Sequence, residues 1–365
     1  MKIARVLPAL LLILVLAGVG FGIYRSHQVA ATHARLAATA QIVGAIGSEK
    51  GPLLADPDVV SALGKAGLAL RVDKVGSREI VTSFKPGAYA FGWPSGAPAA
   101  AELKARAHAA GDVTPIYTPM VIATWKPIAD ILQANGIVSG AGQFRRVDMH
   151  KLAELMLAGK RWNQLDHAEG FPVGKAILVT TTDVRRSNSA AMYLALLSYV
   201  ENGDQVVDDK ATANAMAEKL APLFLRQGFQ EESSADPFSD YAAMGMGKTP
   251  LLFAYESQVI EYLLKPDAAR RSEMVLLYPS PTILSKNVFV PYNDAARRLG
   301  DLLANDPTIR AAAQRYGYRL PSSAAIPQAW RTAGIAAPDT LIDVVDPPSF
   351  STLETMITVI QEKLQ

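Results

Sequence analysis

Two long extended segments interrupt an otherwise regular alternation of strand and helix patterns. Residues 114–125 (TPIYTPMVIATW) and 274–292 (MVLLYPSPTILSKNVFVPY) are both apolar and punctuated by prolines. Proline is poorly tolerated inside helices, so both segments are expected to be extended. The first segment leaves one α/β region, and the second follows another. We therefore expect an α/β chain with two lobes that are joined by two hinge crossings, since closing such lobes requires few backbone dihedrals to change.

The segments on either side of the crossings predict the lobes. Strand patterns at 41–47, 68–75 and 89–93 alternate with helical patterns at 52–66 and 97–110. Strands separated by helices imply βαβ units and a largely parallel sheet. Lobe I is expected to comprise residues 41–117 and 281–365, and lobe II residues 118–280. Within lobe II, KAILVTT at 175–181 is the strongest strand pattern.

The N-terminal segment predicts a membrane anchor. Lys2 and Arg5 precede an uncharged run from Val6 to Tyr24, close to the roughly 20 residues that a helix needs to cross a bilayer. A cleavable signal peptide has a shorter apolar region that ends at small residues, and cleavage is the alternative. We expect residues 1–24 to be a cytoplasmic tip and signal anchor, followed by a spacer at 25–40. The basic N-terminus places the main domain in the periplasm or extracellular space, as a single-pass protein of the inner (cytoplasmic) membrane.

Composition excludes several classes of function. The net charge is +2 and the basic residues are interspersed, so no nucleic-acid partner is expected. The chain has no cysteine, which removes disulfides and thiolate chemistry. Residues 245–249 (GMGKT) resemble the end of a phosphate loop, but Ala242 stands where the first glycine is required. The five histidines lack metal-ligand spacing. No catalytic constellation is found, so we expect a protein that is not an enzyme and binds no cofactor or metal.

Polar loops at strand ends supply the candidate binding site. Ligands of open α/β sheets bind beyond the carboxyl ends of strands, where helix N-termini offer unpaired N–H groups. Three loops precede predicted helices, at 47–50 (GSEK), 93–96 (WPSG) and 183–189 (DVRRSNS), and a fourth, GSR at 76–78, ends a strand. The candidate ligand-binding residues are Ser48, Glu49, Ser77, Arg78, Trp93, Ser95, Arg185, Ser187, Asn188, Tyr255 and Glu256.

Each candidate also has a structural role open to it. Four loop serines are suited to capping the helices that follow them: Ser48, Ser95, Ser187 and Ser189. Glu49 and Glu256 either face the cleft, which favours a ligand with an amine or hydroxyl over a bare dianion, or point to solvent or a helix dipole. Trp93 and Tyr255 either stack on a ligand or pack at strand ends.

Three stretches of the chain resemble one known family. They are the opening strand with its GSEK turn, TTDVRRSNSAAMYLALLSYV at 181–200, and PYNDAARRLGDLLANDPTIRAAAQRYGYR at 291–319. In order and spacing, over roughly 41–320, they resemble the type II periplasmic solute-binding proteins of ABC transporters, especially the molybdate-like branch. The resemblance implies hydroxyl ligands near Ser48, Ser77 and Ser187. It also implies a membrane permease as a partner.

The tail, residues 321–365, resembles the extension found where such domains are combined with von Willebrand A domains, which implies a von Willebrand A-type protein as another partner. The expected function is a membrane-anchored solute-binding protein that captures a small polar or anionic ligand between its lobes. The alternative is a non-catalytic scaffold of an envelope complex whose cleft is degenerate.

Overall fold

A computed structural model describes residues 40–228, 230–231, 234–266, 268, 271–323 and 325–364. The predicted anchor at 6–24 and all of the spacer except Ala40 lie outside these residues. Within the described part of the chain, no helix has the length and apolar character needed to cross a bilayer.

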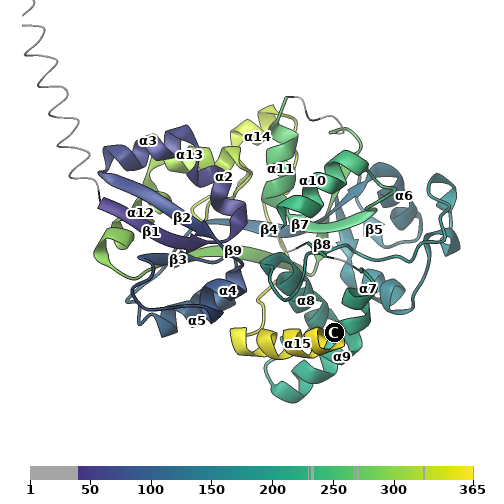
Figure 1. The fold of residues 1–365 in the computed structure, drawn as a ribbon. Helices are drawn as coiled ribbons and strands as arrows, with labels where there is room; N and C mark the ends of the chain where they lie inside the picture. The colour runs from purple at the N-terminus through teal and green to yellow at the C-terminus, as the bar shows by residue number, and fades with distance from the viewer. Residues whose placement is uncertain are drawn as a thin grey trace, which may run out of the picture.

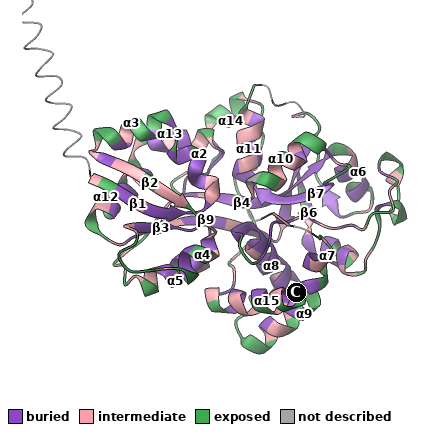
Figure 2. Cartoon of the chain, viewed as in Figure 1, coloured by how far each residue is buried: buried purple, intermediate pink, exposed green. Residues whose placement is uncertain are grey.

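The apolar side chains gather into two halves. The first half holds the buried side chains from Ile42 to Ile116 and from Phe289 to Leu320. The second half holds those from Met120 to Ile283 and from Ile326 to Ile360. Figure 2 shows most of the strands buried beneath helices whose outer faces are exposed, whereas the strand Leu68–Lys74 is mainly of intermediate exposure.

Three parallel strands build the first half. They are β1 (Ala40–Ile46), β2 (Leu68–Lys74) and β3 (Phe91–Trp93), with β1 in the middle. One face is covered by α2 (Gly51–Leu54), α3 (Pro57–Lys65), α12 (Asp294–Asn305) and α13 (Pro307–Arg315), and the other by α4 (Ser77–Thr82) and α5 (Ala97–Arg106) (Figure 1). Because side chains alternate along a strand, Ile42 and Ile46 pack under the first face and Ala45 under the second.

The helix predicted at 52–66 is two helices, because the chain breaks at Asp56-Pro57. The carboxylate of Asp56 accepts the backbone N–H groups of Asp58 at 2.8 Å and Val59 at 3.4 Å, and so caps α3. Proline is favoured in the first turn of a helix, where its missing N–H costs nothing. A short 3-10 turn (Ser48–Lys50) precedes α2.

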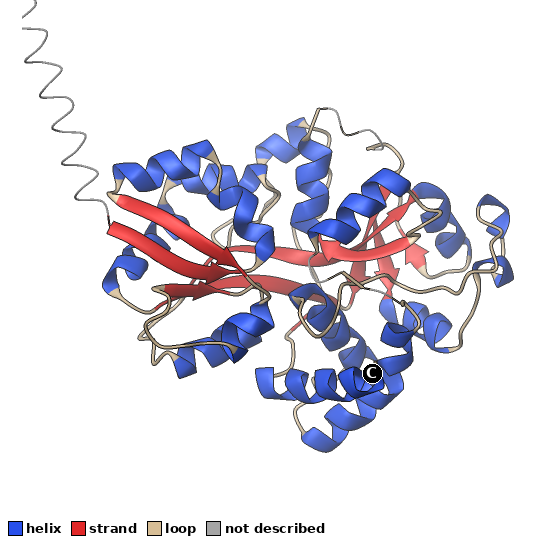
Figure 3. Ribbon diagram, viewed as in Figure 1, coloured by secondary structure: helices blue, strands red, loops and turns tan. Residues whose placement is uncertain are grey.

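Two strands cross between the halves and lie side by side. The first is β4 (Val113–Trp125), and the segment predicted at 274–292 forms β8 (Met274–Ser280) and β9 (Thr282–Pro291). β4 and β9 are antiparallel, with Ile116 opposite Asn287 and Thr118 opposite Ser285. Hydrogen bonding is thus continuous through both halves in the order β2-β1-β3-β9-β4-β8-β6-β5 (Figure 3). The apolar cores of the two halves nevertheless stay separate.

The sheet of the second half is mixed. β7 (Leu251–Tyr255) and β8 pair antiparallel with β4, whereas β6 (Phe144–Asp148) is parallel to β8, and β5 (Val138–Ser139) forms the edge. The expected parallel pairing therefore holds for β1 with β2, for β1 with β3 and for β6 with β8. The helices of this half are α6 (Lys126–Ala134), α7 (Met149–Leu157), α8 (Asn188–Glu201), α9 (Lys210–Leu225), α10 (Ala235–Met244) and α11 (Glu256–Leu264), with short 3-10 turns at Trp162–Gln164 and Ala168–Gly170.

Residues 175–181 do not form the regular strand predicted for them. The segment makes one isolated bridge at each end, Ala176 with Arg161 and Thr180 with Leu252. Its two ends therefore pair with different partners and no ladder develops. Ile177 and Val179 are fully buried, so the apolar pattern reflected burial of extended chain rather than a strand.

The C-terminal tail was expected to belong to lobe I, but most of its buried side chains pack in the second half. It contains α14 (Gln328–Thr332), β10 (Val344–Val345) and α15 (Phe350–Lys363). Trp330, Met356 and Ile360 belong to the core of the second half, and α15 lies along α9 (Figure 1). Phe350, at the start of α15, packs against the first half. The tail therefore contacts both halves.

Candidate functional site

A cleft of about 310 Å³ lies where the strand ends of the first half meet the second half. The first half contributes the loops after β1, β2 and β3, and the second half contributes the start of α8 and the end of β7. Seven of the residues singled out from the sequence line it: Ser48, Glu49, Ser77, Ser95, Ser187, Asn188 and Tyr255.

Glycines allow the two walls to approach each other. A Cβ atom on Gly76 would lie 2.4 Å from the carbonyl oxygen of Arg186, and one on Gly96 would lie 2.4 Å from Asn188 Oδ1. Real Cβ atoms do not come so close, so only glycine fits at either position without movement of the opposite wall. The halves are thus in direct contact at the rim of the cleft.

A buried lysine organises the floor of the cleft. Lys50 Nζ donates to Glu49 Oε1, to Ser95 Oγ at 2.9 Å and to Asn287 Oδ1 at 2.9 Å. It also lies 5.6 Å from the centre of the Trp93 ring. Burial lowers the pKa of this ammonium, and the Glu49 carboxylate opposes that effect. Sequence reasoning missed Lys50 because a lysine in a polar loop is usually exposed.

Glu49 faces the cleft, as the first of its two alternatives required. Its side chain is only 6% exposed, and Oε1 accepts hydrogen bonds from Lys50 and from the Ser95 hydroxyl. Its backbone carbonyl accepts a 3.0 Å hydrogen bond from Tyr318. The carboxylate therefore forms part of the floor of the cleft.

Ser95 is the centre of this hydrogen-bond network. Its N–H donates to Ser77 Oγ at 2.8 Å, and its carbonyl accepts from Asn188 Nδ2 at 3.1 Å and from the Ser285 hydroxyl. Every polar group of Ser95 is therefore engaged, and it joins the loop after β3 to α4, α8 and β9.

Three of the serines do not cap helices. Ser187 precedes α8 but makes no side-chain cap; its hydroxyl lies 3.0 Å from Ser189 Oγ. The N-caps of α4 and α5 are Gly76 and Gly96, so Ser77 and Ser95 do not have that role either. The capping alternative is therefore wrong for Ser95 and Ser187. Ser48 lies in the 3-10 turn, at the cleft wall.

The two aromatic candidates differ in their placement. Tyr255 lines the cleft, where its hydroxyl accepts a 3.2 Å hydrogen bond from Asn188 Nδ2. Burial, and next the charge of Glu49, raise the pKa of this phenol, which is therefore neutral. Trp93 is buried below the cleft, with Nε1 donating to the Asn287 carbonyl at 2.9 Å and its ring edge-on to Phe289. Trp93 is a packing residue.

Three charged candidates do not line the cleft. Arg78 donates to Glu354 of α15 at 2.6 Å, and Arg185 pairs with Asp183 at 2.6 Å. Glu256 is fully buried in the core. Both of its oxygens accept from Arg319 at 2.7 Å, and Tyr278 also donates to it at 2.5 Å. Glu256 therefore neither faces the cleft nor points to solvent; it lies in the first turn of α11, where the helix dipole favours a carboxylate. Its arginine partner could not be foreseen, because Arg319 is distant in sequence.

Seven further residues line the cleft, and four of them have polar or charged side chains that sequence reasoning did not single out: Lys74, Glu79, Arg186 and Ser234. Lys74 and Glu79 flank the predicted GSR loop, and Arg186 lies within the predicted 183–189 loop. Ser234 had no such signal, because it follows a polar stretch without a recognisable strand end.

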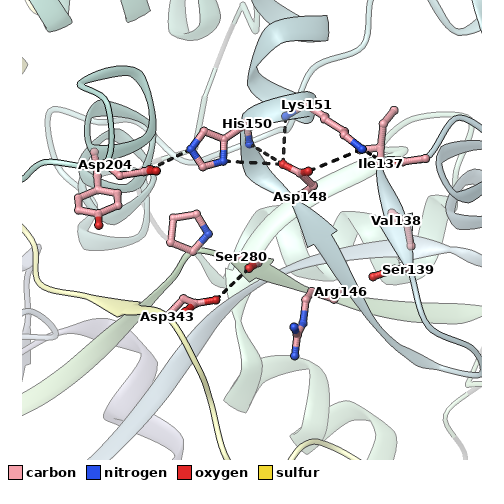
Figure 4. A pocket seen from close by; sticks show the side chains of 13 residues that line it. Ile137, Val138, Ser139, Arg146, Asp148, His150, Lys151, Asp204, Ser280 and Asp343 are labelled. Atoms are coloured by element: carbon pink, nitrogen blue, oxygen red, sulfur yellow. Dashed lines mark hydrogen bonds and ion pairs between the residues drawn. The ribbon is translucent and has the colours of Figure 1, made fainter.

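A larger hollow of about 540 Å³ lies within the second half, beside β5, β6 and the start of α7 (Figure 4). None of the eleven candidates lines it. Its side chains pair with one another: His150 Nε2 lies 2.9 Å from Asp204 Oδ1, and the Ser280 hydroxyl lies 3.4 Å from Asp343 Oδ2. Because the walls of this hollow come from one half, movement of the halves would not enclose a ligand there. The smaller cleft between the halves is the better candidate.

Comparison with known proteins identifies which known fold the chain has. No family model and no curated protein matches the chain. Among solved structures, iron-bound HitA from Pseudomonas aeruginosa is similar, with a TM-score of 0.53, 11% identity, and 88% of this chain and 99% of that chain covered. The periplasmic binding protein P5PA gives 0.51 at 10% identity, covering 89% of this chain and 98% of its own. The periplasmic molybdate-binding protein of Azotobacter vinelandii gives 0.45 at 15% identity, covering 77% and 100%.

The fold is therefore the two-domain α/β fold of the type II periplasmic binding proteins, as the sequence resemblance predicted. At these identities the likeness concerns the fold alone.

Proposed function

We propose that the chain is an extracytoplasmic solute-binding protein that captures a small polar ligand in the cleft between its halves. The observation that carries the proposal is the convergence of three strand ends of one half with the α8 N-terminus and the β7 end of the other. In open α/β sheets, ligands bind at such a place.

The two crossing strands support capture by movement of the halves. Among the strands that the structure describes, β4 and β9 run through both cores, and they are paired antiparallel where they cross. The chain also returns from Leu320 in the first core to Ile326 in the second. A bend in these two strands changes the width of the cleft without disturbing either core. A ligand that touches both walls stabilises the closed arrangement through its higher affinity for that form. In this proposal the lobes divide as predicted, except that the chain from Ile326 onward belongs with residues 118–280.

The membrane location is also part of the proposal. The uncharged run from Val6 to Tyr24 supports a signal anchor in the cytoplasmic membrane, with the described domain on its outer side. A protein held there is placed to pass its ligand to a membrane permease.

The test is ligand binding by the full-length chain purified in detergent. A thermal-shift panel of oxyanions, amino acids, amines and sugars should raise the unfolding midpoint with at least one class. The bulky substitution Ser187→Leu should abolish that shift, because Ser187 lines the cleft and is nearly buried. Ser83→Leu, at the exposed end of α4, is the matched control and should preserve it. Failure of every class to shift the midpoint would contradict the proposal.

One observation favours a second candidate, a non-catalytic scaffold of an envelope complex. The terminal helix α15 packs its apolar face on α9 but reaches the first half through Phe350 and the 2.6 Å ion pair of Glu354 with Arg78. A helix that ties both halves together favours a rigid body. A scaffold should bring a stoichiometric protein, such as a von Willebrand A-type partner, through purification from solubilised membranes with or without small molecules.

A further inference from the structure

We infer that the cleft binds its ligand through an ammonium group that contacts Glu49, rather than through an oxyanion. This inference rests on the proposed function and specifies its ligand class. It follows from counting which donors and acceptors on the cleft floor are already used.

The donors of the floor are consumed within the protein. An ammonium has three N–H donors, and those of Lys50 bind Glu49 Oε1, Ser95 Oγ and Asn287 Oδ1. The single O–H of Ser95 donates to Glu49 Oε1, and its N–H donates to Ser77 Oγ. The buried cation and the central serine therefore have no proton left for an incoming anion.

One acceptor of the floor is not consumed. Among the described residues, the hydrogen bonds to the Glu49 carboxylate all reach Oε1, and none reaches Oε2. The side chain is 6% exposed, so water reaches it only through the cleft. A carboxylate oxygen that is so deeply placed gains most from a charged donor, because charge-assisted hydrogen bonds are the strong ones.

Gly47 has no side chain and so leaves space for the Glu49 carboxylate. A Cβ atom at position 47 would lie 2.7 Å from Glu49 Oε2 and 2.3 Å from Ser95 Oγ. A side chain there would displace both groups, so the carboxylate occupies the floor only because residue 47 is glycine. The protein's own carboxylate thus fills a position where an oxyanion would otherwise meet the loop after β1.

An oxyanion is disfavoured in the same position for two reasons. It would face Glu49 Oε2 across the cleft, which is a like-charge contact. It would also find the N–H and O–H groups of Lys50 and Ser95 already bonded. An ammonium group meets the opposite conditions, since it supplies the donors that the floor lacks.

The test compares the full-length chain with two sets of probes by calorimetric titration: putrescine, arginine and glucosamine as amines, and molybdate, sulfate and phosphate as oxyanions. We expect at least one amine to bind and the oxyanions not to bind. Glu49→Gln should weaken the amine at least tenfold. The double substitution Glu49→Gln with Lys50→Met should do the same without leaving a buried unpaired ammonium.

Glu102→Gln removes the same charge from an exposed position on α5 and is the control. Oxyanion binding by the unaltered chain would overturn the inference while leaving the proposed function intact. Equal amine affinity in the Glu49 variants would also overturn it. Absence of binding by all six probes would count against both.

Discussion

Asn188 Nδ2 donates a 3.1 Å hydrogen bond to the carbonyl oxygen of Ser95. This bond joins the first turn of α8, in the second half, to the loop after β3, in the first half. The same amide lies 3.2 Å from the hydroxyl of Tyr255. One side chain therefore links both walls of the cleft, and it does so beside the floor that carries Glu49 and Lys50.

Asn188→Ala should weaken both the contact between the halves and the affinity for a ligand. A typical hydrogen bond contributes about 1 kcal/mol, so the free energy of unfolding should fall by about 1–2 kcal/mol in chemical denaturation. Asn202→Ala, at the opposite end of α8, is the control: it removes one solvent-exposed hydrogen bond, to the Gln205 carbonyl, and should change the free energy of unfolding by less than about 0.5 kcal/mol. An effect of equal size in the two variants would contradict the role given to Asn188.

Gly96→Ala should hold the halves apart. The added methyl group would meet Asn188 Oδ1 at 2.4 Å, so the cleft must widen or Asn188 must move. We expect a larger radius of gyration in small-angle X-ray scattering and a lower ligand affinity. Gly64→Ala has open space around its Cβ atom and lies within α3, so it should leave the scattering unchanged and stabilise the helix by about 0.5–1 kcal/mol. Identical scattering from both variants would contradict the expectation.

Glu256→Gln should destabilise the protein strongly without changing which ligand the cleft binds. Glu256 and Arg319 are both buried and make two 2.7 Å hydrogen bonds. Removing one partner of a buried pair leaves an uncompensated charge and costs about 3–5 kcal/mol. Glu261→Gln, on the same helix, removes a half-exposed pair with Lys265 and should cost less than about 1 kcal/mol. Urea denaturation separates the two, and a small loss for Glu256→Gln would show that the buried pair is not structural.

Acid should remove stability that depends on Asp183. Burial raises the pKa of this carboxyl, but hydrogen bonds from the Arg185 side chain and backbone outweigh it, so the pKa lies below its usual value. A carboxyl whose pKa is lowered in the folded state stabilises the protein when the pH is above the pKa of the unfolded state, about 3.9. This contribution is lost as the pH falls through the pKa of the folded state.

Asp183→Asn should therefore lower the thermal midpoint at about pH 6 and reduce its further fall toward about pH 3. Asp301→Asn, an exposed aspartate on α12, serves as the control and should keep the acid dependence of the unaltered chain. Parallel pH profiles for all three proteins would contradict the role of Asp183.

Local patterns were enough to predict most elements and their order. The strands at 41–47, 68–75 and 251–255 and the two crossing segments are where the sequence placed them, because apolar periodicity reports burial directly. The same signal misled at 175–181, where the buried chain is extended but has no continuous partner. Periodicity reports burial, and it does not report which strand lies alongside.

The sequence alone determined that two long extended segments run between two α/β halves, and that polar loops follow the strands facing a common cleft. It did so because turns, strand ends and helix starts depend on neighbouring residues. Only the tertiary structure decided which charged and polar side chains meet. Arg319 pairs with Glu256, Arg78 pairs with Glu354, and Lys50 reaches Asn287 across long separations in sequence. Ionic partners are chosen by which surfaces come together in space, and that depends on the packing of the whole chain.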